Sequence, residues 1–411
     1  MPRGAAVAAV VSVFVAICLI CPVAVGADAS MVPLSPAFTI GPKEGTAHQP
    51  VVIYGPDACE YLVVWSSVTQ GETGEDVWGQ RVSWEGDLLG DPVAICDSVG
   101  DQLLPDVAYS SLAHEYLVVW QDHRTVEGSG ADVYARRVGT QGDLIGSELS
   151  ITAAGGDQSR PRIAYSAIAE QYLIVWQDSE AGGDESDIFG RWLVADGGWA
   201  GDEFSICDAT GGQSVPDVVA DQSRRQCLVV WEDGRHAAWK HQDIYARFVI
   251  PGAAEDSPEI KVASALAPEY SPRVAYNAVL DEYLVLWEDE IGGRRLSGEG
   301  EPIGPSFALF RASPYLRRPA LLANADSGDW VVVWEDRCED GAPHTDLFVR
   351  CLRASGREGE DGSALCDLES NQFSPSIAAN VRRGEVMAVW SDDVGGDGSL
   401  VIRGRRYMLS S

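Results

Sequence analysis

The stretch Tyr-Leu-Val-Val-Trp at residues 116–120 decides the fold, because close copies of it recur along the whole chain. Each copy ends in a tryptophan, and successive tryptophans are 55, 56, 55, 56, 47 and 56 residues apart. Internal repeats of this kind indicate a structure built from one supersecondary unit. Seven anchors therefore predict seven units. They are Trp65, Trp120, Trp176, Trp231, Trp287, Trp334 and Trp390.

Four short segments in each unit are typical of β-strands. In the second unit they are expected at 105–109, 116–120, 132–138 and 149–152, each bounded by Gly, Pro, Asp or Ser. The 116–120 segment is apolar without alternation, which indicates a strand that is packed on both faces. Tandem four-stranded units covered in this way are typical of propellers. The predicted fold class is all-β, a seven-bladed β-propeller of four-stranded antiparallel blades.

The two ends of the chain predict how the ring closes. Residues 38–40 match a fourth strand but have no unit before them, whereas the seventh unit stops at 407–411, just after its third strand. We therefore expect the N-terminal strand to close the last blade, because this leaves no open interblade interface. The predicted propeller domain is 34–411, preceded by a short linker at 28–33.

Variation in length is confined to the connection between the second and third strands. The fifth unit lacks nine residues there, so a tight hairpin is expected after Trp287. Because strands alternate in direction, this connection emerges on the same face as the connection from each fourth strand to the next first strand. We call this face the loop face. Loops on a rigid scaffold commonly carry binding residues, so the loop face is the expected functional face.

Residues 1–27 have the features of a secretory signal, with Arg3, an apolar run at 5–20 and a small-residue cleavage site. An uncleaved anchor of spanning length is one alternative, and a lipoprotein signal at Cys18 or Cys21 is another. We expect cleavage, no membrane span in the mature chain, and a secreted, extracellular or periplasmic location.

The 411-residue chain has 62 acidic and 30 basic residues, a formal net charge of −32. A field of this sign repels nucleic acid and anionic lipid, so neither is an expected partner. It would attract cations, or simply provide an acidic surface that keeps a monomer soluble. Seven cysteines follow the signal, and their odd number and spacing indicate small buried side chains rather than a disulfide framework.

Charged residues recur on the second and third strands. If Trp120 pairs across the hairpin with Val138, Asp122 falls opposite Arg136, and such a pair contributes about 0.2–1 kcal/mol. Because these residues recur in nearly every blade, we interpret them as scaffold rather than as calcium ligands or a catalytic pair. The expected pairs are Asp122/Arg136, Asp178/Arg191, Asp233/Arg247, Asp289/Arg294, Asp336/Arg350 and Asp392/Arg405, with a neutral Ser67/Gln80 pair in the first blade.

The fourth-blade loop at 234–241 carries the most unusual residues of the loop face. Its Trp, His and cationic side chains suit an anionic or carbohydrate ligand, although a loop packed on its neighbour is the alternative. Glutamines three residues before the first-strand prolines either line a ligand site near the channel mouth or hydrogen-bond to their own turns. The candidate ligand-binding residues are Arg235, His236, Trp239, Lys240, His241, Gln102, Gln158 and Gln213, and the expected partner is a protein or a glycan.

No catalytic residue, metal ligand or cofactor is predicted. The sequence lacks the sialidase-type aspartate box, the Gly-x-Ser-x-Gly elbow and a phosphate-binding glycine loop. A glycosidase carboxylate pair would leave no such motif, so catalysis on glycans is an alternative. The acidic loops at 180–187 and 392–397 would suit calcium in composition, but they lack the spacing of a calcium loop, and we interpret them as solvated turns.

Two motifs of the second unit resemble the repeats of exported bacterial β-propeller proteins. They are Tyr-Leu-Val-Val-Trp-Gln-Asp at 116–122 and Asp-Val-Tyr-Ala-Arg-Arg-Val at 132–138. These proteins are similar in architecture to TolB-like and WD-repeat propellers. The resemblance covers residues 34–411 and implies the fold and an interaction role, without a substrate. The leading hypothesis is a non-enzymatic extracellular binding module with its site on the loop face. A glycan-cleaving hydrolase or lyase and a structural cell-envelope protein are the alternatives.

Overall fold

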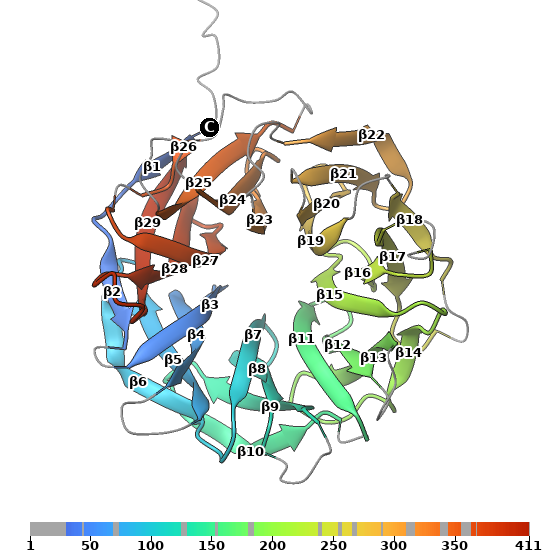
Figure 1. Ribbon diagram of the computed structural model, residues 1–411, viewed down its shortest axis with the longest axis horizontal. Helices are drawn as coiled ribbons and strands as arrows, with labels where there is room; N and C mark the ends of the chain where they lie inside the picture. The colour runs from blue at the N-terminus through green and yellow to red at the C-terminus, as the bar shows by residue number, and fades with distance from the viewer. Residues whose placement is uncertain are drawn as a thin grey trace, which may run out of the picture.

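The computed structural model describes residues 30–410 except for short stretches at 43–44, 69–73, 125–129, 153–154, 180–184, 237–240, 254–256, 265–268, 289–290, 310–316, 338–343, 355–362 and 367. Its strands form seven antiparallel sheets, which stand around a central opening as the blades of a propeller (Figure 1). The first strand of each blade lies next to this opening (Figure 1). The expected seven-bladed all-β fold is therefore confirmed.

The blades follow one another in chain order. Blade 1 contains β3 (Thr46–Gly55), β4 (Glu60–Val68), β5 (Glu75–Ser83) and β6 (Leu88–Cys96), and blade 2 contains β7 (Gln102–Ser110), β8 (Glu115–Asp122), β9 (Asp132–Gly139) and β10 (Leu144–Ser150). Blade 3 contains β11 (Asp157–Ser166), β12 (Gln171–Ser179), β13 (Ser186–Val194) and β14 (Phe204–Cys207), and blade 4 contains β15 (Gln213–Ala220), β16 (Cys227–Asp233), β17 (Asp243–Val249) and β18 (Ile260–Ala263). Blade 5 contains β19 (Tyr270–Asn277), β20 (Glu282–Glu288), β21 (Gly292–Ser297) and β22 (Pro302–Ala308), and blade 6 contains β23 (Arg317–Ala323), β24 (Trp330–Arg337), β25 (Thr345–Leu352) and β26 (Ser363–Ala364). Blade 7 contains β27 (Asn371–Asn380), β28 (Glu385–Asp393) and β29 (Val401–Ser410), together with the N-terminal strands β1 (Ser30–Pro33) and β2 (Phe38–Gly41).

Both N-terminal strands pair with β29 and so close the ring. Strand β2 sets Thr39 opposite Arg403, and β1 sets Met31 opposite Leu409. The expected closure of the last blade is confirmed. Residues 30–33 belong to this edge rather than to a linker, because β29 continues to Ser410 and offers backbone groups for pairing.

The second strand of each blade is buried by both neighbouring blades. Leu117, Val118, Val119 and Trp120 on β8 are all 0% exposed. Val118 and Trp120 belong to the apolar core shared with blade 1, whereas Leu117 and Val119 belong to the core shared with blade 3. Burial of one such valine or leucine contributes about 1.5–3 kcal/mol. A blade therefore keeps its core only when both neighbours are present.

The second and third strands pair in a register that differs from the expected one. Trp120 lies opposite Tyr134 and Asp122 lies opposite Asp132, so the predicted pairing of Asp122 with Arg136 is wrong. The aromatic rings explain the register, because Trp120 and Tyr134 stack with their centroids 6.4 Å apart. The predicted ion pairs are wrong in the other described blades as well, and Asp289 lies outside the described residues. There the opposing residues are Asp178/Asp187, Asp233/Asp243, Asp336/Asp346, Asp392/Val401 and, in place of Ser67/Gln80, Ser67/Asp76.

The recurrent aspartate binds the anchor tryptophan of its own strand. The Asp122 carboxylate accepts a hydrogen bond of 2.7 Å from the indole Nε1 of Trp120. In blade 1, where Ser67 replaces the aspartate, the indole N–H of Trp65 has no partner among the described residues. The aspartate thus has a structural role, as expected. It performs this role by a hydrogen bond to the tryptophan of its own strand and not by an ion pair with the third strand. The same bond joins Trp176 to Asp178, Trp231 to Asp233 and Trp390 to Asp392.

The recurrent arginine of the third strand joins neighbouring blades. Arg136 donates to the backbone carbonyl of Ile95, at the end of the fourth strand of blade 1, over 3.1 Å. Hydrogen bonds from a charged donor are stronger than those between neutral groups. Each such arginine therefore ties its blade to the preceding one. Equivalent bonds run from Arg191 to Ile151, from Arg294 to Val262 and from Arg350 to Leu309.

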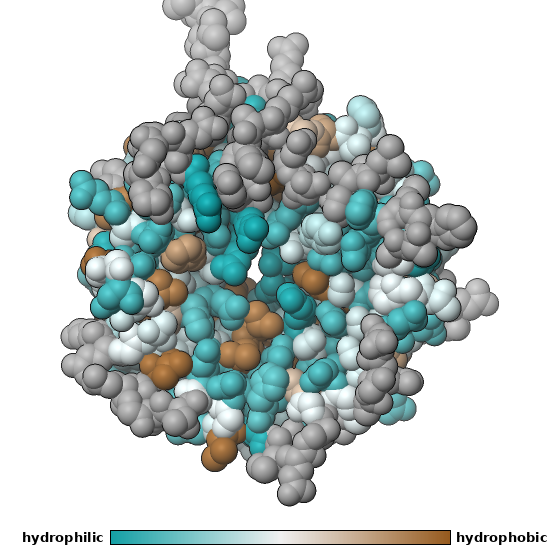
Figure 2. Space-filling view, in the orientation of Figure 1, coloured by the Kyte–Doolittle hydropathy of each residue, from teal (hydrophilic) through white to brown (hydrophobic). Residues whose placement is uncertain are grey.

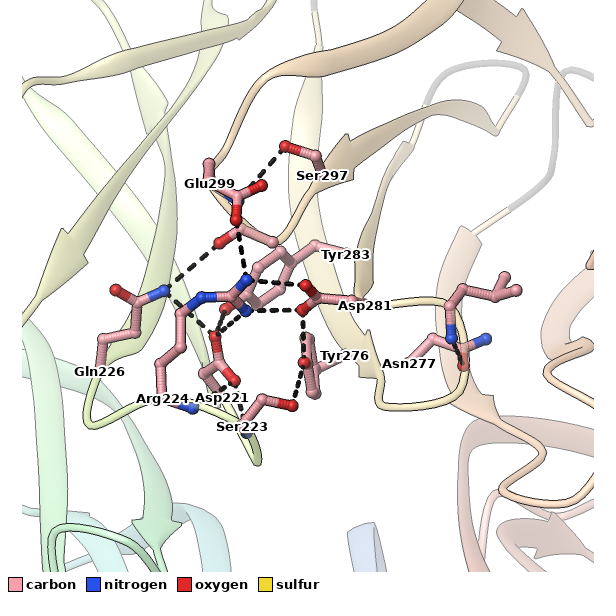
Figure 3. A network of polar contacts seen from close by, with 12 residues as sticks. Asp221, Ser223, Arg224, Gln226, Tyr276, Asn277, Asp281, Tyr283, Ser297 and Glu299 are labelled. Carbon is pink, nitrogen blue, oxygen red and sulfur yellow. Dashed lines mark hydrogen bonds and ion pairs between the residues drawn. The ribbon is translucent and has the colours of Figure 1, made fainter.

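A polar network joins blades 4 and 5 on the face opposite the loop face (Figure 3). At its centre, the guanidinium of Arg224 lies 2.6 Å from Asp281, 2.8 Å from Glu299 and 3.2 Å from the buried Asp221. The Asp221 carboxylate also accepts a hydrogen bond of 2.8 Å from the hydroxyl of Tyr283. One cation therefore holds carboxylates from two adjacent blades together.

The closing strand should contribute strongly to stability. Ile40 on β2 is 3% exposed and packs with Trp65 and Val389, so Ile40→Ala should lower the free energy of unfolding by about 2–5 kcal/mol through lost burial and an unfilled cavity. Chemical denaturation measures this loss. Val99→Ala, at a side chain that is 82% exposed, is the control and should change stability by less than about 0.5 kcal/mol. Equal effects of the two changes would contradict the proposed closure.

The Arg224 network predicts a pH-dependent contribution from Asp281. Hydrogen bonds from Arg224 and Tyr276 lower the pKa of Asp281 from 3.8 to about 2. A depressed folded-state pKa stabilises the fold above the unfolded pKa and ceases to do so as the pH falls through the folded value. The stability difference between the wild type and Asp281→Asn should therefore be full at pH 7 and should vanish as the pH falls from about 4 to about 2.

Urea unfolding of both proteins across this pH range measures the difference. The same comparison in an Arg224→Met background is the control, and it should show a smaller dependence on pH. A difference between wild type and Asp281→Asn that stays constant down to pH 2 would refute the role of the network.

Candidate functional site

A pocket with a volume of about 860 Å³ lies at the loop-face end of the central channel. Its lining comes from the starts of the first strands, such as Gln49 on β3, and from the ends of second strands, such as Glu335 on β24. Small-molecule sites have volumes of roughly 300–1,000 Å³. The ring is hollowed at its centre in Figure 2, with hydrophilic side chains around most of the hollow and a hydrophobic group at one side. The size and place fit a ligand site.

A bulge in each first strand forms the rim of this pocket. In every blade the pairing with the second strand shifts beside the first-strand proline, as between Ser159 and Arg162. The residue before the proline has a φ near +50°, which residues other than glycine rarely adopt. The β-branched Val215, with φ at 50°, shows that the surrounding structure imposes this conformation. The seven rim residues are Gln49, Leu104, Arg160, Val215, Ser271, Arg318 and Ser374.

Side chains of the preceding blade hold the rim residues in place. The residue after the anchor tryptophan is Gln or Glu in blades 2 to 6, and it accepts the backbone N–H of the rim residue in the next blade. Glu232 accepts from Ser271 at 2.6 Å, and Glu288 accepts from Arg318 at 2.8 Å. These hydrogen bonds hold the rim residues in place and also connect adjacent blades. The remaining bonds link Gln121 to Arg160, Gln177 to Val215 and Glu335 to Ser374.

The residue after each first-strand proline, two positions beyond the rim residue, also lines the pocket. It carries a charge in four consecutive blades, with acid and base alternating. The Asp106 carboxylate accepts the backbone N–H of Ile163 at 3.0 Å, and Asp217 accepts that of Val274 at 2.9 Å, so both acids are committed to interblade bonds. In blades 1 to 7 this position holds Val51, Asp106, Arg162, Asp217, Arg273, Ala320 and Ser376.

The charge of the pocket opposes that of the whole protein. Among the described lining residues six are arginines and four are acidic, whereas the chain has 30 basic and 62 acidic residues. The pocket therefore has an excess of positive charge inside a strongly negative molecule. Its arginines are Arg160, Arg162, Arg273, Arg317, Arg318 and Arg337, and its acids are Asp106, Asp217, Glu288 and Glu335.

Burial changes the protonation equilibria of several of these groups. It raises the pKa of the Asp106 carboxyl and that of the Glu335 carboxyl. Burial and the neighbouring Arg162 lower the pKa of Arg273 to about 10. Desolvation disfavours the charged form, and a second charge of the same sign adds to this effect. Arg162 and Arg273 thus lie near enough for their charges to repel each other, at an energetic cost.

Arg235, a predicted ligand-binding residue, belongs to a closed cluster in blade 4. Its guanidinium lies 2.7 Å from the carboxylates of Asp233 and Glu259 and 4.3 Å from the centre of the Tyr245 ring. These contacts account for Arg235 without a ligand, and its binding role stays a prediction. Blade 2 has the same cluster, formed by Arg124, Asp122, Glu148 and Tyr134.

The other predicted site residues are dispersed. Gln102, Gln158 and Gln213 are 0% exposed. Gln102 and Gln213 donate to carbonyl groups of their own turns over 3.1 and 2.7 Å, and Gln158 donates to Asp178 over 3.3 Å. None of the three is among the described residues that line the central pocket. Their role as ligand-binding residues likewise stays a prediction.

Part of the fourth-blade loop lies outside the described residues. Trp239 and Lys240 are there, and His236 and His241, on either side of them, are exposed. The described part of the chain thus brings none of the candidate residues into the pocket. The residues that do line it have a sequence signal, because they flank seven prolines that each follow a fourth strand at a constant spacing. Inspection of the residues beside these prolines would have found the charged ring.

No group of three or more His, Cys, Asp or Glu side chains suited to a metal ion occurs in the described part of the chain. In the 392–397 loop, Asp393 accepts the N–H of Gly398 at 3.2 Å and Asp397 accepts that of Ser399 at 2.9 Å. Both carboxylates thus stabilise the turn. Calcium binding stays the untested alternative to the predicted solvated turns, and residues 180–184 lie outside the described part.

The described cysteines are unpaired, and all except the exposed Cys59 are buried. Cys338 lies outside the described residues. Among residues 30–410, outside the gaps given above, no helix is long and apolar enough to cross a membrane. The predicted signal at 1–27 lies outside the described residues.

Three solved propeller structures are similar to this chain. A protein of unknown function from Dyadobacter fermentans has a TM-score of 0.56 and 11% identity, over 93% of this chain and 99% of its own. An α-L-arabinofuranosidase from Fusarium graminearum, in complex with an iminosugar inhibitor, has a TM-score of 0.51 and 13% identity, over 74% and 92%. A mutant of the Trypanosoma rangeli sialidase has a TM-score of 0.48 and 8% identity, over 92% and 59%.

No protein-family model and no curated protein matches the sequence. At such low identities the three structures share the fold alone with this chain. The class that the fold defines is the seven-bladed β-propeller, here with a ligand-sized pocket at its axis. The narrower resemblance to exported bacterial repeat proteins stays a prediction.

Arg235 should be essential to the stability of blade 4. Arg235→Ala leaves the fully buried side chain of Asp233 without its cation, so the free energy of unfolding should fall by about 3–5 kcal/mol. Chemical denaturation measures the loss. His236→Ala, at the exposed neighbouring position, is the control and should change stability by less than about 0.5 kcal/mol. An Arg235→Ala variant as stable as the wild type would contradict the scaffold role.

Proposed function

We propose that the chain is an extracellular, non-enzymatic binding module that holds its ligand in the central pocket of the loop face. The pocket volume of about 860 Å³ supports this role, as does its position at the face from which the variable loops emerge. Its rim is held by hydrogen bonds between blades, as between Glu288 and Arg318. A rim fixed in this way is preorganised, which reduces the entropic cost of binding.

The observation that carries the proposal is that the acidic residues of the pocket already form interblade bonds. Asp106, Asp217, Glu288 and Glu335 each accept the backbone N–H of a residue in the next blade. A catalytic carboxyl must exchange a proton with the substrate during the reaction. Protonation would weaken a bond that holds two blades together, because a neutral carboxyl is a poorer hydrogen-bond acceptor than a carboxylate. These carboxylates are therefore better suited to hold the pocket than to cleave a ligand.

Glu335 supports the alternative, a glycan hydrolase or lyase. Its carboxyl is buried, lines the pocket and has a pKa raised by burial, which are properties of a general acid. Its bond to the Ser374 N–H and the Arg318 guanidinium at 3.5 Å favour the ionised form instead. We therefore keep catalysis as the second candidate. A purely structural role in the cell envelope has no comparable support.

Ligand binding should depend on the open volume of the pocket. Ala320 lines the pocket at the ring position where other blades have charged residues, so Ala320→Trp should fill part of the volume and block binding. The protein would be applied to arrays of glycans and small molecules, and each hit would be measured again with this variant. Leu112→Trp, on the opposite face and 53% exposed, is the control and should retain every hit. Hits that survive Ala320→Trp would contradict a site in the pocket.

A second test separates binding from catalysis. The wild type should hydrolyse chromogenic glycosides no faster than Glu335→Gln does, because we assign Glu335 to the scaffold. Release of the chromophore would be followed from pH 4 to pH 8. Turnover by the wild type that Glu335→Gln abolishes, in a variant that still binds the glycoside, would establish the hydrolase and overturn the non-enzymatic proposal.

A further inference from the structure

We propose that the central pocket recognises a small ligand bearing a carboxylate, sulfate or phosphate group, which Arg162 and Arg273 bind together. This inference rests on the proposed binding function and adds the chemistry of the ligand. The two arginines occupy the same ring position in blades 3 and 5, with Asp217 of blade 4 between them.

Most of the hydrogen-bond donors of these two arginines have no partner among the described residues. Arg162 approaches the Asp217 carboxylate only to 3.9 Å, the limit of an ion pair. Arg273 donates to the carbonyl of Pro272 over 3.2 Å and has no ion pair among the described residues. A guanidinium has five N–H donors in a planar fork, and this fork matches the oxygens of an oxyanion. Both side chains are therefore able to donate to a ligand.

The electrostatics of the ring favour an anion between these arginines. Two guanidinium groups in a partly desolvated pocket repel each other, and this repulsion contributes to the lowered pKa of Arg273. The carboxylates beside them compensate only in part, because Asp106 and Asp217 also serve the backbone of the next blade. An oxyanion that contacts both guanidinium groups would offset the repulsion and supply acceptors for their N–H groups.

The rim extends the positive charge toward the mouth of the pocket. Arg160 and Arg317 are exposed, line the pocket and have no ion pair among the described residues. A ligand with a second anionic group would therefore bind more tightly than one with a single group. Leu104, Val51 and Ala320 line the pocket elsewhere and leave room for the uncharged part of such a ligand.

A small ligand fits these observations better than an anionic polymer does. The excess of positive charge is confined to a pocket of about 860 Å³, whereas the chain as a whole has a net charge of −32. A long polyanion would extend beyond the pocket and be repelled by the acidic surface. A small anion is shielded from that surface by solvent ions, because charges separated by more than about 8 Å are largely screened at physiological salt.

Titration calorimetry with sodium sulfate, sodium phosphate and sodium citrate, at constant ionic strength maintained with sodium chloride, tests the proposal. The wild type should bind at least one of these anions, and citrate, with several carboxylates, should distinguish carboxylate from sulfate or phosphate recognition. Arg162→Gln and Arg273→Gln should each weaken binding by about tenfold to a hundredfold, because a charge-assisted contact is lost. Arg225→Gln, which removes an exposed arginine from the opposite face, should leave binding unchanged.

A further variant adds a negative charge while keeping the interblade bond. Ser376 accepts the backbone N–H of Val52 at 3.2 Å, just as Asp106 and Asp217 accept the equivalent N–H groups in their blades. Ser376→Asp should therefore fold normally, which thermal unfolding checks, and should weaken anion binding by about tenfold. If instead Ser376→Asp and both glutamine variants fold and bind every anion as the wild type does, the proposal is overturned.

The outcomes distinguish the inference from the proposed function. Absence of anion binding, together with a neutral ligand whose binding Ala320→Trp abolishes, would overturn the anion inference and leave the pocket as the binding site. Absence of any ligand that Ala320→Trp affects would overturn both. Anion binding that Ala320→Trp, both arginine variants and Ser376→Asp all weaken, and that Arg225→Gln leaves unchanged, supports both.

Discussion

The apolar second strand of each blade needs a neighbour on both of its faces, and the rest of the structure depends on this constraint. On β8, alternate side chains pack into the cores shared with blade 1 and with blade 3. No sheet of this kind is stable alone, because one whole apolar face would be exposed to water. The ring must therefore close, and the pairing of β2 with β29 closes it by covering the last core.

Hydrogen bonds between blades supplement this apolar packing and, unlike it, depend on the orientation of each blade relative to its neighbour. Third-strand arginines such as Arg136 reach the preceding blade, whereas the glutamines and glutamates after the anchor tryptophans reach the next one. The second set also holds the strained rim residues at the channel. Formation of the pocket is thus coupled to assembly of the ring, because the same side chains do both. The rim of the pocket is therefore held in place by the blades themselves.

The pocket also shows how local and overall charge differ. The chain is strongly acidic, yet six arginines among its described residues line the central pocket. The residue after the first-strand proline has the same backbone position in every blade. Its side chain can therefore differ in charge from blade to blade without a change in the backbone. Four consecutive blades carry alternating charges, whereas Val51, Ala320 and Ser376 complete the ring. A scaffold of nearly identical units thereby acquires an asymmetric site.

The repeat alone determined the number of blades, their order, the closing strand and the loop face, because each depends on spacings along the chain. Register did not follow from the repeat. Stacking of Trp120 on Tyr134 set Asp122 opposite Asp132, and a pattern of charges contains no information on which rings stack. The site was also decided by tertiary structure. Arg162 and Arg273 are 111 residues apart in sequence, and only the circular arrangement of the blades brings their side chains to one pocket.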